Sequence, residues 1–182
     1  MMDYPFIVLD GVDGTGKSVI ASILTEEIGG VLLKTPPQEL ATSRCYFDSQ
    51  GTTEEKFLYY LLGVKMVSDR ARELKQLKPV VCDRFLYTTF AYHLAAGLNL
   101  KWLEVVNTYD ILQPDFSFII ECSDEKERHR RLEQRGYSIA DRNSDGIIDI
   151  VRSEYQRFSM IKIDTFGKSV IECLEIIKQF LH

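Results

Sequence analysis

The sequence lacks several features that would place it in a specialised class of protein. Its four cysteines form no C-x-x-C pair, so neither a disulfide framework nor a zinc site is expected. Charged residues interrupt every apolar run well before ~18 residues, which excludes a membrane span. The N-terminus has no positive region preceding an apolar stretch, so it does not resemble a secretion signal. We therefore expect a cytoplasmic protein with no membrane partner, whose thiols are reduced and mostly buried.

An excess of basic residues is also missing. The net charge is −5, whereas nucleic-acid-binding modules usually carry a basic excess, so no nucleic-acid partner is expected. The chain has 182 residues, of which 45% are apolar and 27% charged. This size and composition fit one globular domain spanning residues 1–182.

Short apolar runs alternate with helical patterns along the chain. Near-continuous apolar strands of this kind predict a parallel sheet that helices cover on both faces. The expected strands are residues 4–10, 31–34, 79–83, 116–122 and 160–164. The expected helices are residues 18–28, 52–76, 86–110 with a break near 97–99, 124–135 capped by Ser123, 146–158, and a terminal helix opened by Ser169. A polar stretch lies between Pro37 and Gly51 and is assigned to none of the expected strands or helices.

Residues 11–18, GVDGTGKS, match the pattern G-x-x-x-x-G-K-[ST] between an expected strand and an expected helix. In such a loop, backbone N–H groups surround phosphate oxygens, the lysine neutralises the β- and γ-phosphates, and the serine hydroxyl binds Mg²⁺. The motif predicts a P-loop NTPase-type three-layer α/β sandwich that binds ATP and Mg²⁺. The expected ATP-binding residues are Gly11, Val12, Asp13, Gly14, Thr15, Gly16, Lys17 and Ser18.

A carboxylate at the end of a second apolar strand would complete such a site. Asp83 and Glu121 are the candidates, and Asp83 is followed directly by Arg84. A carboxylate can orient the metal shell, and a guanidinium can hold a second phosphate with two hydrogen bonds. Two phosphate-binding devices in one crevice favour phosphoryl transfer between nucleotides over hydrolysis. The alternative interpretation of Asp83–Arg84 is a surface ion pair.

Several segments together resemble the thymidylate kinase family of P-loop nucleoside monophosphate kinases. The segment CDRFLYTTFAYH, from Cys82 to His93, is similar to the family signature D-R-Y-x-x-S-x-x-A-Y-Q. Arg135-Gly136 followed by Asp141-Arg142 resembles the family's lid, here about residues 136–146. The segment VRSEYQRF, containing Tyr155, fits the helix after the lid. The resemblance spans nearly the whole chain.

The resemblance implies transfer of the ATP γ-phosphoryl group to a pyrimidine deoxynucleotide, with dTMP as the expected acceptor, and implies a homodimer. It assigns catalysis to Lys17, Asp83, Arg84, Arg135 and Arg142. It assigns the metal to Ser18 and Asp83. The acceptor would be bound by Asp13, Lys34, Met66, Arg70, Arg84, Thr88, Tyr92 and His93.

The chain departs from the family pattern at three acceptor positions. Lys34 stands in place of an arginine, Met66 in place of an aromatic residue, and His93 in place of a glutamine. His93 either hydrogen-bonds the base or packs in the interior. These changes leave open a different monophosphate acceptor, a deoxynucleoside kinase, or a nucleotide-binding regulatory protein without catalysis. Arg128 and Arg130, among acidic neighbours, are expected to form a solvated, salt-bridged helix face.

Overall fold

The fold is built on a five-stranded parallel sheet, described here from a computed structural model that covers residues 4–137 and 145–181. The strand order is β2-β3-β1-β4-β5, and every pairing is parallel. The strands are β1 (Phe6–Asp10), β2 (Val31–Lys34), β3 (Val80–Asp83), β4 (Phe116–Glu121) and β5 (Ile161–Asp164). Each falls within its expected range, so the strand predictions are confirmed.

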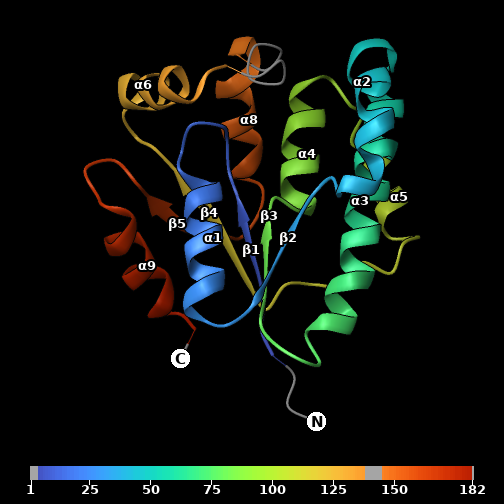
Figure 1. The fold of residues 1–182 in the computed structure, drawn as a ribbon. Coiled ribbons are helices and arrows are strands. Elements are labelled where there is room, and N and C mark those ends of the chain that lie inside the picture. The colour runs from blue at the N-terminus through green and yellow to red at the C-terminus, as the bar shows by residue number, and fades with distance from the viewer. Residues whose placement is uncertain (1–3, 138–144, 182) are drawn as a thin grey trace.

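Helices cover both faces of the sheet (Figure 1). Helices α1 (Lys17–Glu27) and α9 (Val170–Lys178) pack on one face, and α3 (Thr53–Leu74), α4 (Leu86–Ala95) and α8 (Ile148–Tyr155) pack on the other. Within β1, Ile7 and Leu9 pack in the core under α1 and α9, whereas Phe6 and Val8 pack in the core on the opposite face, under α3 and α4. Because each strand is buried on both faces, it reads as a continuous apolar run. The three-layer α/β sandwich is confirmed.

The polar segment between Pro37 and Gly51, which the sequence patterns assign to no element, is helical. It forms a 3₁₀ turn, η1 (Gln38–Leu40), and helix α2 (Ala41–Gln50). The helix is held by contacts with α3 that local sequence does not reveal. The ring of Phe47 stacks on that of Tyr59 with centroids 4.7 Å apart, and the Tyr60 hydroxyl donates to Asp48 at 2.9 Å. Tertiary packing therefore overrides the weak local pattern.

Most helix ends follow their capping residues. Thr52 and Ser169 form capping boxes at the starts of α3 and α9. Helix α6 (Glu125–Arg135) is capped by Asp124, whose Oδ1 accepts from the Glu127 amide at 2.7 Å, and not by Ser123 as expected. The expected helix over 86–110 is α4 followed by the short α5 (Trp102–Val106), with the predicted break between them. The expected helix over 146–158 is η2 (Asp145–Ile147) leading into α8.

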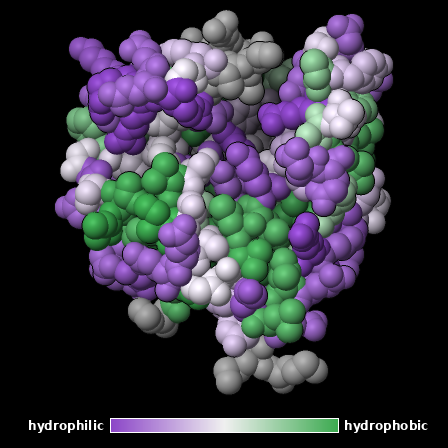
Figure 2. All heavy atoms as spheres, viewed as in Figure 1, coloured by the Kyte–Doolittle hydropathy of each residue, from purple (hydrophilic) through white to green (hydrophobic). Residues whose placement is uncertain are grey.

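The carboxyl ends of all five strands meet at one edge of the sheet, because the strands are parallel. The loop between β1 and α1 and the helix α6 lie at this edge, at the top of Figure 1. In Figure 2, α6 presents a strongly hydrophilic surface at the upper left. Ligands of open α/β sheets bind at this edge, so the site is sought there. None of the described helices is long and apolar enough to cross a bilayer.

Candidate active site

The glycine-rich loop is packed tightly between β1 and α6. Gly14 has φ +85°, and a Cβ there would lie 2.9 Å from both Arg128 Cγ and Leu132 Cγ. Gly11 has φ +141°, and a Cβ there would lie 2.3 Å from the Ile120 carbonyl oxygen. Both positions therefore require glycine, for the backbone angle and for the space. The loop's shape is imposed by its neighbours before any ligand binds.

The lysine and serine that end the loop contact the carboxylate of Asp83. Lys17 is the first residue of α1 and is 4% exposed, and its Nζ lies 3.5 Å from Asp83 Oδ1. The Ser18 hydroxyl donates to Asp83 Oδ2 at 2.7 Å. Burial would raise the pKa of Asp83, but the Lys17 ammonium and the Ser18 hydrogen bond lower it below its usual value. Asp83, rather than Glu121, is thus the strand-end carboxylate that faces the loop.

Asp83 and Ser18 together provide oxygen ligands that suit a divalent cation. Asp83 Oδ1 accepts no hydrogen bond from any residue that the structure describes, although its oxygen is buried. The Ser18 hydroxyl is a second oxygen donor beside it. Mg²⁺ prefers oxygen ligands and usually keeps several waters, taking one or two protein ligands together with substrate phosphates. One carboxylate and one hydroxyl at a phosphate-binding loop match that requirement.

Arg84 lies across the crevice and is held by Asp13 of the loop. Its Nη2 is 2.6 Å from Asp13 Oδ1, and its guanidinium carbon lies 5.5 Å from the centre of the Tyr92 ring. The Tyr92 hydroxyl reaches Asp13 Oδ2 at 3.5 Å. Burial opposes the charge on Asp13, but the guanidinium of Arg84 and the ammonium of Lys17 lower its pKa to about 2. Three expected acceptor residues therefore meet at the loop.

Other expected acceptor residues line a separate groove of about 600 Å³ beside β2. Lys34, Met66 and Arg70 all border it, together with Pro36 and Glu39. Arg70 Nη1 lies 3.5 Å from Glu39 Oε1, and both side chains are mostly exposed. Lys34, whose side chain is 63% exposed, borders the groove and also reaches the loop, since its Nζ lies 3.8 Å from Asp83 Oδ2. Lys34 therefore links the groove to the carboxylate that contacts the glycine-rich loop.

Two expected acceptor residues point elsewhere. His93 is 8% exposed, does not border the groove, and its Nδ1 lies 2.6 Å from the Thr89 carbonyl oxygen. Its ring packs against the rings of Phe57 and Tyr60, and burial lowers its pKa to about 4. This placement favours the alternative that His93 packs in the interior. Thr88 hydrogen-bonds Asp10 and Tyr155, as described below.

The arginines of α6 lie closer to the loop than the sequence indicates. Arg128 is 2% exposed, and its Nη1 donates to the Asp13 carbonyl oxygen at 3.0 Å, so the expectation of a solvated Arg128 is wrong. Arg131 Nη1 donates to Thr165 Oγ1 at 2.8 Å. The signal was available: Leu132, the one apolar residue of this charged helix, marks the buried face, and Arg128 stands one turn before it.

The two expected lid arginines differ in how far they can be placed. Arg135 ends α6, and its charge is among those that lower the pKa of Asp13. Arg142 lies outside the described residues, as does most of the expected lid over 136–146.

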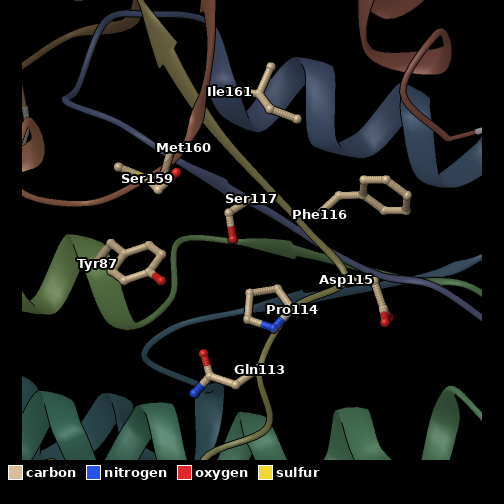
Figure 3. Close-up of a pocket in the computed structure, with 9 residues that line it drawn as sticks. All are labelled: Tyr87, Gln113, Pro114, Asp115, Phe116, Ser117, Ser159, Met160 and Ile161. Atoms are coloured by element: carbon tan, nitrogen blue, oxygen red, sulfur yellow. The ribbon is translucent and has the colours of Figure 1, made fainter.

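A second cavity lies at the opposite edge of the sheet, where β4 and β5 begin. It has a volume of about 320 Å³ and contains no expected site residue. Figure 3 shows the residues around it, which are Tyr87, Gln113, Pro114, Asp115, Phe116, Ser117, Ser159, Met160 and Ile161. The candidate site is therefore the loop with its adjoining groove, at the carboxyl edge.

The sheet order, the glycine-rich loop and the Asp83–Arg84 pair define a nucleotide kinase of the P-loop class. The thymidylate kinase family model matches residues 9–163, and the chain belongs to the thymidylate kinase family. A probable thymidylate kinase of Pyrococcus horikoshii is 33% identical over 147 residues, covering 72% of this chain and 71% of that protein. The protein is accordingly an ATP-dependent nucleoside monophosphate kinase, and the alternatives left open by the sequence are not favoured.

Solved structures agree on the fold. The thymidylate kinase of Candida albicans superposes with a TM-score of 0.83 at 18% identity, covering 98% of this chain and 91% of that one. A deoxyadenosine kinase from M. mycoides superposes with a TM-score of 0.73 at 18% identity, covering 97% and 98% of the two chains. The fold is thus shared by kinases with different acceptors, and the acceptor must be argued from the site.

Proposed function

We propose that this protein phosphorylates dTMP, transferring the γ-phosphoryl group of ATP to give dTDP and ADP. The observation that carries the proposal is the meeting of two phosphate-binding devices. Asp83 contacts Lys17 and Ser18 of the glycine-rich loop, and the next residue, Arg84, faces Asp13 of the same loop. Arg84 lies within hydrogen-bonding reach of the loop, where an acceptor phosphate would stand in line with the γ-phosphate.

The transfer asks little covalent chemistry of the protein. The bond from the γ-phosphorus to the β,γ-bridging oxygen breaks, and a bond to an oxygen of the acceptor phosphate forms, so catalysis is positioning and charge stabilisation. Lys17 stabilises the β- and γ-phosphate oxygens. Ser18 and Asp83 would hold Mg²⁺, which would supply positive charge to the phosphate oxygens of ATP. The acceptor phosphate takes the place of Asp13 at the Arg84 guanidinium, and Asp13 and Tyr92 then face the sugar.

The groove supplies the base site. Met66 covers one face of the pyrimidine, Arg70 donates to the base edge, and Lys34 supplies a point charge toward the acceptor phosphate. A thioether gives up the ~0.5–1.5 kcal/mol that offset ring stacking adds beyond burial. We therefore expect at least one non-thymine monophosphate to be used within about 100-fold of dTMP in kcat/KM, a gap of about 2.7 kcal/mol.

A panel of acceptors tests the proposal. ADP formation is measured with MgATP and dTMP, dUMP, dCMP, UMP, CMP, dGMP and AMP, with thymidine and deoxycytidine as nucleoside controls. The expected result is the highest kcat/KM for dTMP and none for the nucleosides. A higher kcat/KM for any other acceptor overturns the assignment to dTMP. A preference for dTMP above about 10⁴ over every other acceptor contradicts the loose base site.

Further features are proposed from the sequence patterns and from the resemblance to the family. Arg135 and Arg142 close on the phosphates from a lid over residues 136–146, within a single domain of residues 1–182. The enzyme is cytoplasmic, acts on no nucleic acid and forms a homodimer. Magnesium is the metal. Sedimentation equilibrium tests the dimer, and loss of activity on chelation, restored by Mg²⁺, tests the metal.

A further inference from the structure

A buried chain of hydrogen bonds joins four elements beneath the site. Asp10 ends β1 with a fully buried side chain, and its Oδ1 accepts from the Phe85 amide at 2.8 Å and from the Thr88 hydroxyl. Thr88, on α4, lies with its Oγ1 2.8 Å from the Tyr155 hydroxyl. Tyr155, the last residue of α8, lies with that hydroxyl 3.2 Å from the Gly11 amide. This chain of hydrogen bonds thus connects the glycine-rich loop to the segment after Arg84.

The direction of every bond in this chain is determined. The Gly11 amide can only donate, so the Tyr155 oxygen accepts from it. Burial raises the pKa of Tyr155 well above its usual value, so its hydroxyl stays protonated. Because the single hydroxyl proton of Thr88 is donated to Asp10 Oδ1, the Tyr155 hydroxyl is the donor in its contact with Thr88 Oγ1. The Thr88 hydroxyl then donates to Asp10 Oδ1, which already accepts from backbone amides. Hydrogen bonds aligned in one direction polarise each other, so the loss of one weakens the others.

The two ends of the chain hold backbone that the reaction needs in one place. Gly11 opens the glycine-rich loop, with a φ that is rare for other residues. Arg84 has φ 71°, a left-handed conformation that is strained for a side-chain-bearing residue. The Arg84 amide donates to the Leu9 carbonyl, and the next amide, that of Phe85, donates to Asp10. The strained arginine is therefore fixed between the ends of β1 and α4.

We infer that the Tyr155 hydroxyl is a positioning group for phosphoryl transfer, because it holds the loop entrance at Gly11 and the Arg84 backbone in mutual register through Thr88 and Asp10. The inference rests on the proposed roles of the loop and Arg84. Tyr155 is 1% exposed and packs among Val12, Ala91, Ile119, Ile148 and Val151, so we assign it a positioning role and no direct contact with substrate. Its ring packs in the hydrophobic core, and its hydroxyl positions the backbone of the site.

The test separates the hydroxyl from the ring. Tyr155→Phe keeps the ring and removes the hydroxyl, and Thr88→Val breaks the next bond with little change in volume. A displacement of about 1 Å in a reacting group can cost about 10²-fold, so each variant is expected to lower kcat about 10- to 100-fold. The KM for ATP should stay within about threefold, because the loop still surrounds the phosphates. The double variant should be no worse than the poorer single variant, since both break one chain.

Two control variants and one spectroscopic measurement complete the experiment. Thr88→Ser keeps the hydroxyl and should recover most of the kcat that Thr88→Val loses. Tyr87→Phe, next to Thr88, removes a hydroxyl from a ring that stacks on Phe158 and should leave kcat unchanged. Amide exchange followed by ¹⁵N NMR should show faster exchange at Gly11 in Tyr155→Phe.

Several outcomes would overturn the inference. One is a kcat for Tyr155→Phe within twofold of wild type despite faster exchange at Gly11, which would make the hydroxyl purely structural. Others are losses of kcat that multiply in the double variant, or a loss of kcat in Tyr87→Phe equal to that in Tyr155→Phe. An unchanged rate of amide exchange at Gly11 in Tyr155→Phe would also overturn it. Rates are measured with the monophosphate that the acceptor panel ranks first. A failure of dTMP as the acceptor is then distinguishable from a failure of Tyr155 as a positioning residue.

Discussion

The phosphate-binding half of the site and the acceptor groove are built in opposite ways. Lys17 and Asp83 are about 4% exposed and are locked by Ser18 and by each other. In the groove, the side chains of Arg70 and Glu39 are 62% and 56% exposed and touch only at 3.5 Å. The charges that act on the transferred phosphoryl group are therefore placed before substrate binds. The base-reading side chains must be ordered by the substrate, at about 0.5–1.5 kcal/mol for each side chain immobilised.

Removing the charge of Lys17 should produce the largest effect on kcat. Lys17 belongs to the phosphate-binding half of the site, whose charges are in place before substrate binds. Lys17→Met keeps the apolar stem and removes the charge on the β- and γ-phosphates. Loss of one such transition-state contact typically lowers kcat 10²- to 10³-fold. Steady-state kinetics with MgATP and dTMP measures it. Lys162→Met, which removes an exposed lysine 3.5 Å from Glu121, is the control and should be near wild type. A kcat for Lys17→Met within about 10-fold of wild type would contradict the loop assignment.

Changing Arg84 should affect the acceptor and spare ATP. Arg84→Lys keeps a charge but loses the planar fork that holds a phosphate with two hydrogen bonds. We expect the KM for the monophosphate to rise about 10- to 100-fold, a loss of the size usual for a buried charged contact. Calorimetry with each nucleotide separately decides the matter. If the affinity for ATP falls as far as that for the monophosphate, Arg84 belongs to the donor site.

The pH dependence of stability tests whether His93 is buried in the protein interior and not exposed at the acceptor groove. Burial lowers its pKa to about 4, against 6.5 for an unperturbed histidine. Between these values the unfolded chain binds more protons than the folded protein, so stability rises with pH across this window. Lowering the pH from 7 to 5 should cost on the order of 1–2 kcal/mol through His93. Urea unfolding at several pH values should show that His93→Gln removes this part of the slope. An unchanged slope would place His93 in contact with solvent.

Met66→Phe should have the smallest effect, an increase in the base selectivity of the exposed acceptor groove. A ring at this position would stack on a pyrimidine, adding about 0.5–1.5 kcal/mol to its binding. The preference for dTMP over dGMP and AMP, as a ratio of kcat/KM values, should rise about 2- to 10-fold. Leu62→Phe, on the same helix but outside the groove, is the matched control. A similar gain from Leu62→Phe would show that the new ring acts through general packing.

Sequence patterns predicted the framework because the framework is local. Apolar strands, the glycine-rich loop and the boxes at Thr52 and Ser169 each depend on a few neighbouring residues, and all appear as expected. The misses depend on distant contacts. Helix α2 forms against α3, and Arg128 is buried because Gly14 lets α6 approach the loop. Asp48 and its partner Tyr60 are 12 residues apart on different helices, and Arg128 and Asp13 are 115 residues apart, so a local pattern reveals neither contact.

The site residues divide along the same line. Asp83 and Arg84 could be singled out because they follow a strand directly, and the fold then placed them at the loop. Tyr155 gave no chemical signal, since its hydroxyl matters only through Gly11 and Thr88, which lie on other elements. His93 occupied a position with an acceptor role in the family pattern, but its ring turns toward Phe57 and Tyr60. A motif fixes where a residue stands, whereas packing fixes which way it faces.

The left-handed backbone at Arg84 has a consequence for protein engineering. A side-chain-bearing residue at φ 71° costs about 1–2 kcal/mol that glycine would not incur. Arg84→Gly would relieve this strain, but it would also leave the Asp13 carboxylate without the guanidinium that lowers its pKa, and loss of one partner of a buried ion pair costs about 3–5 kcal/mol. A search for stabilising substitutions should therefore leave Arg84 unchanged, because the ion pair that fixes the strained backbone contributes more stability than a glycine at this position would restore.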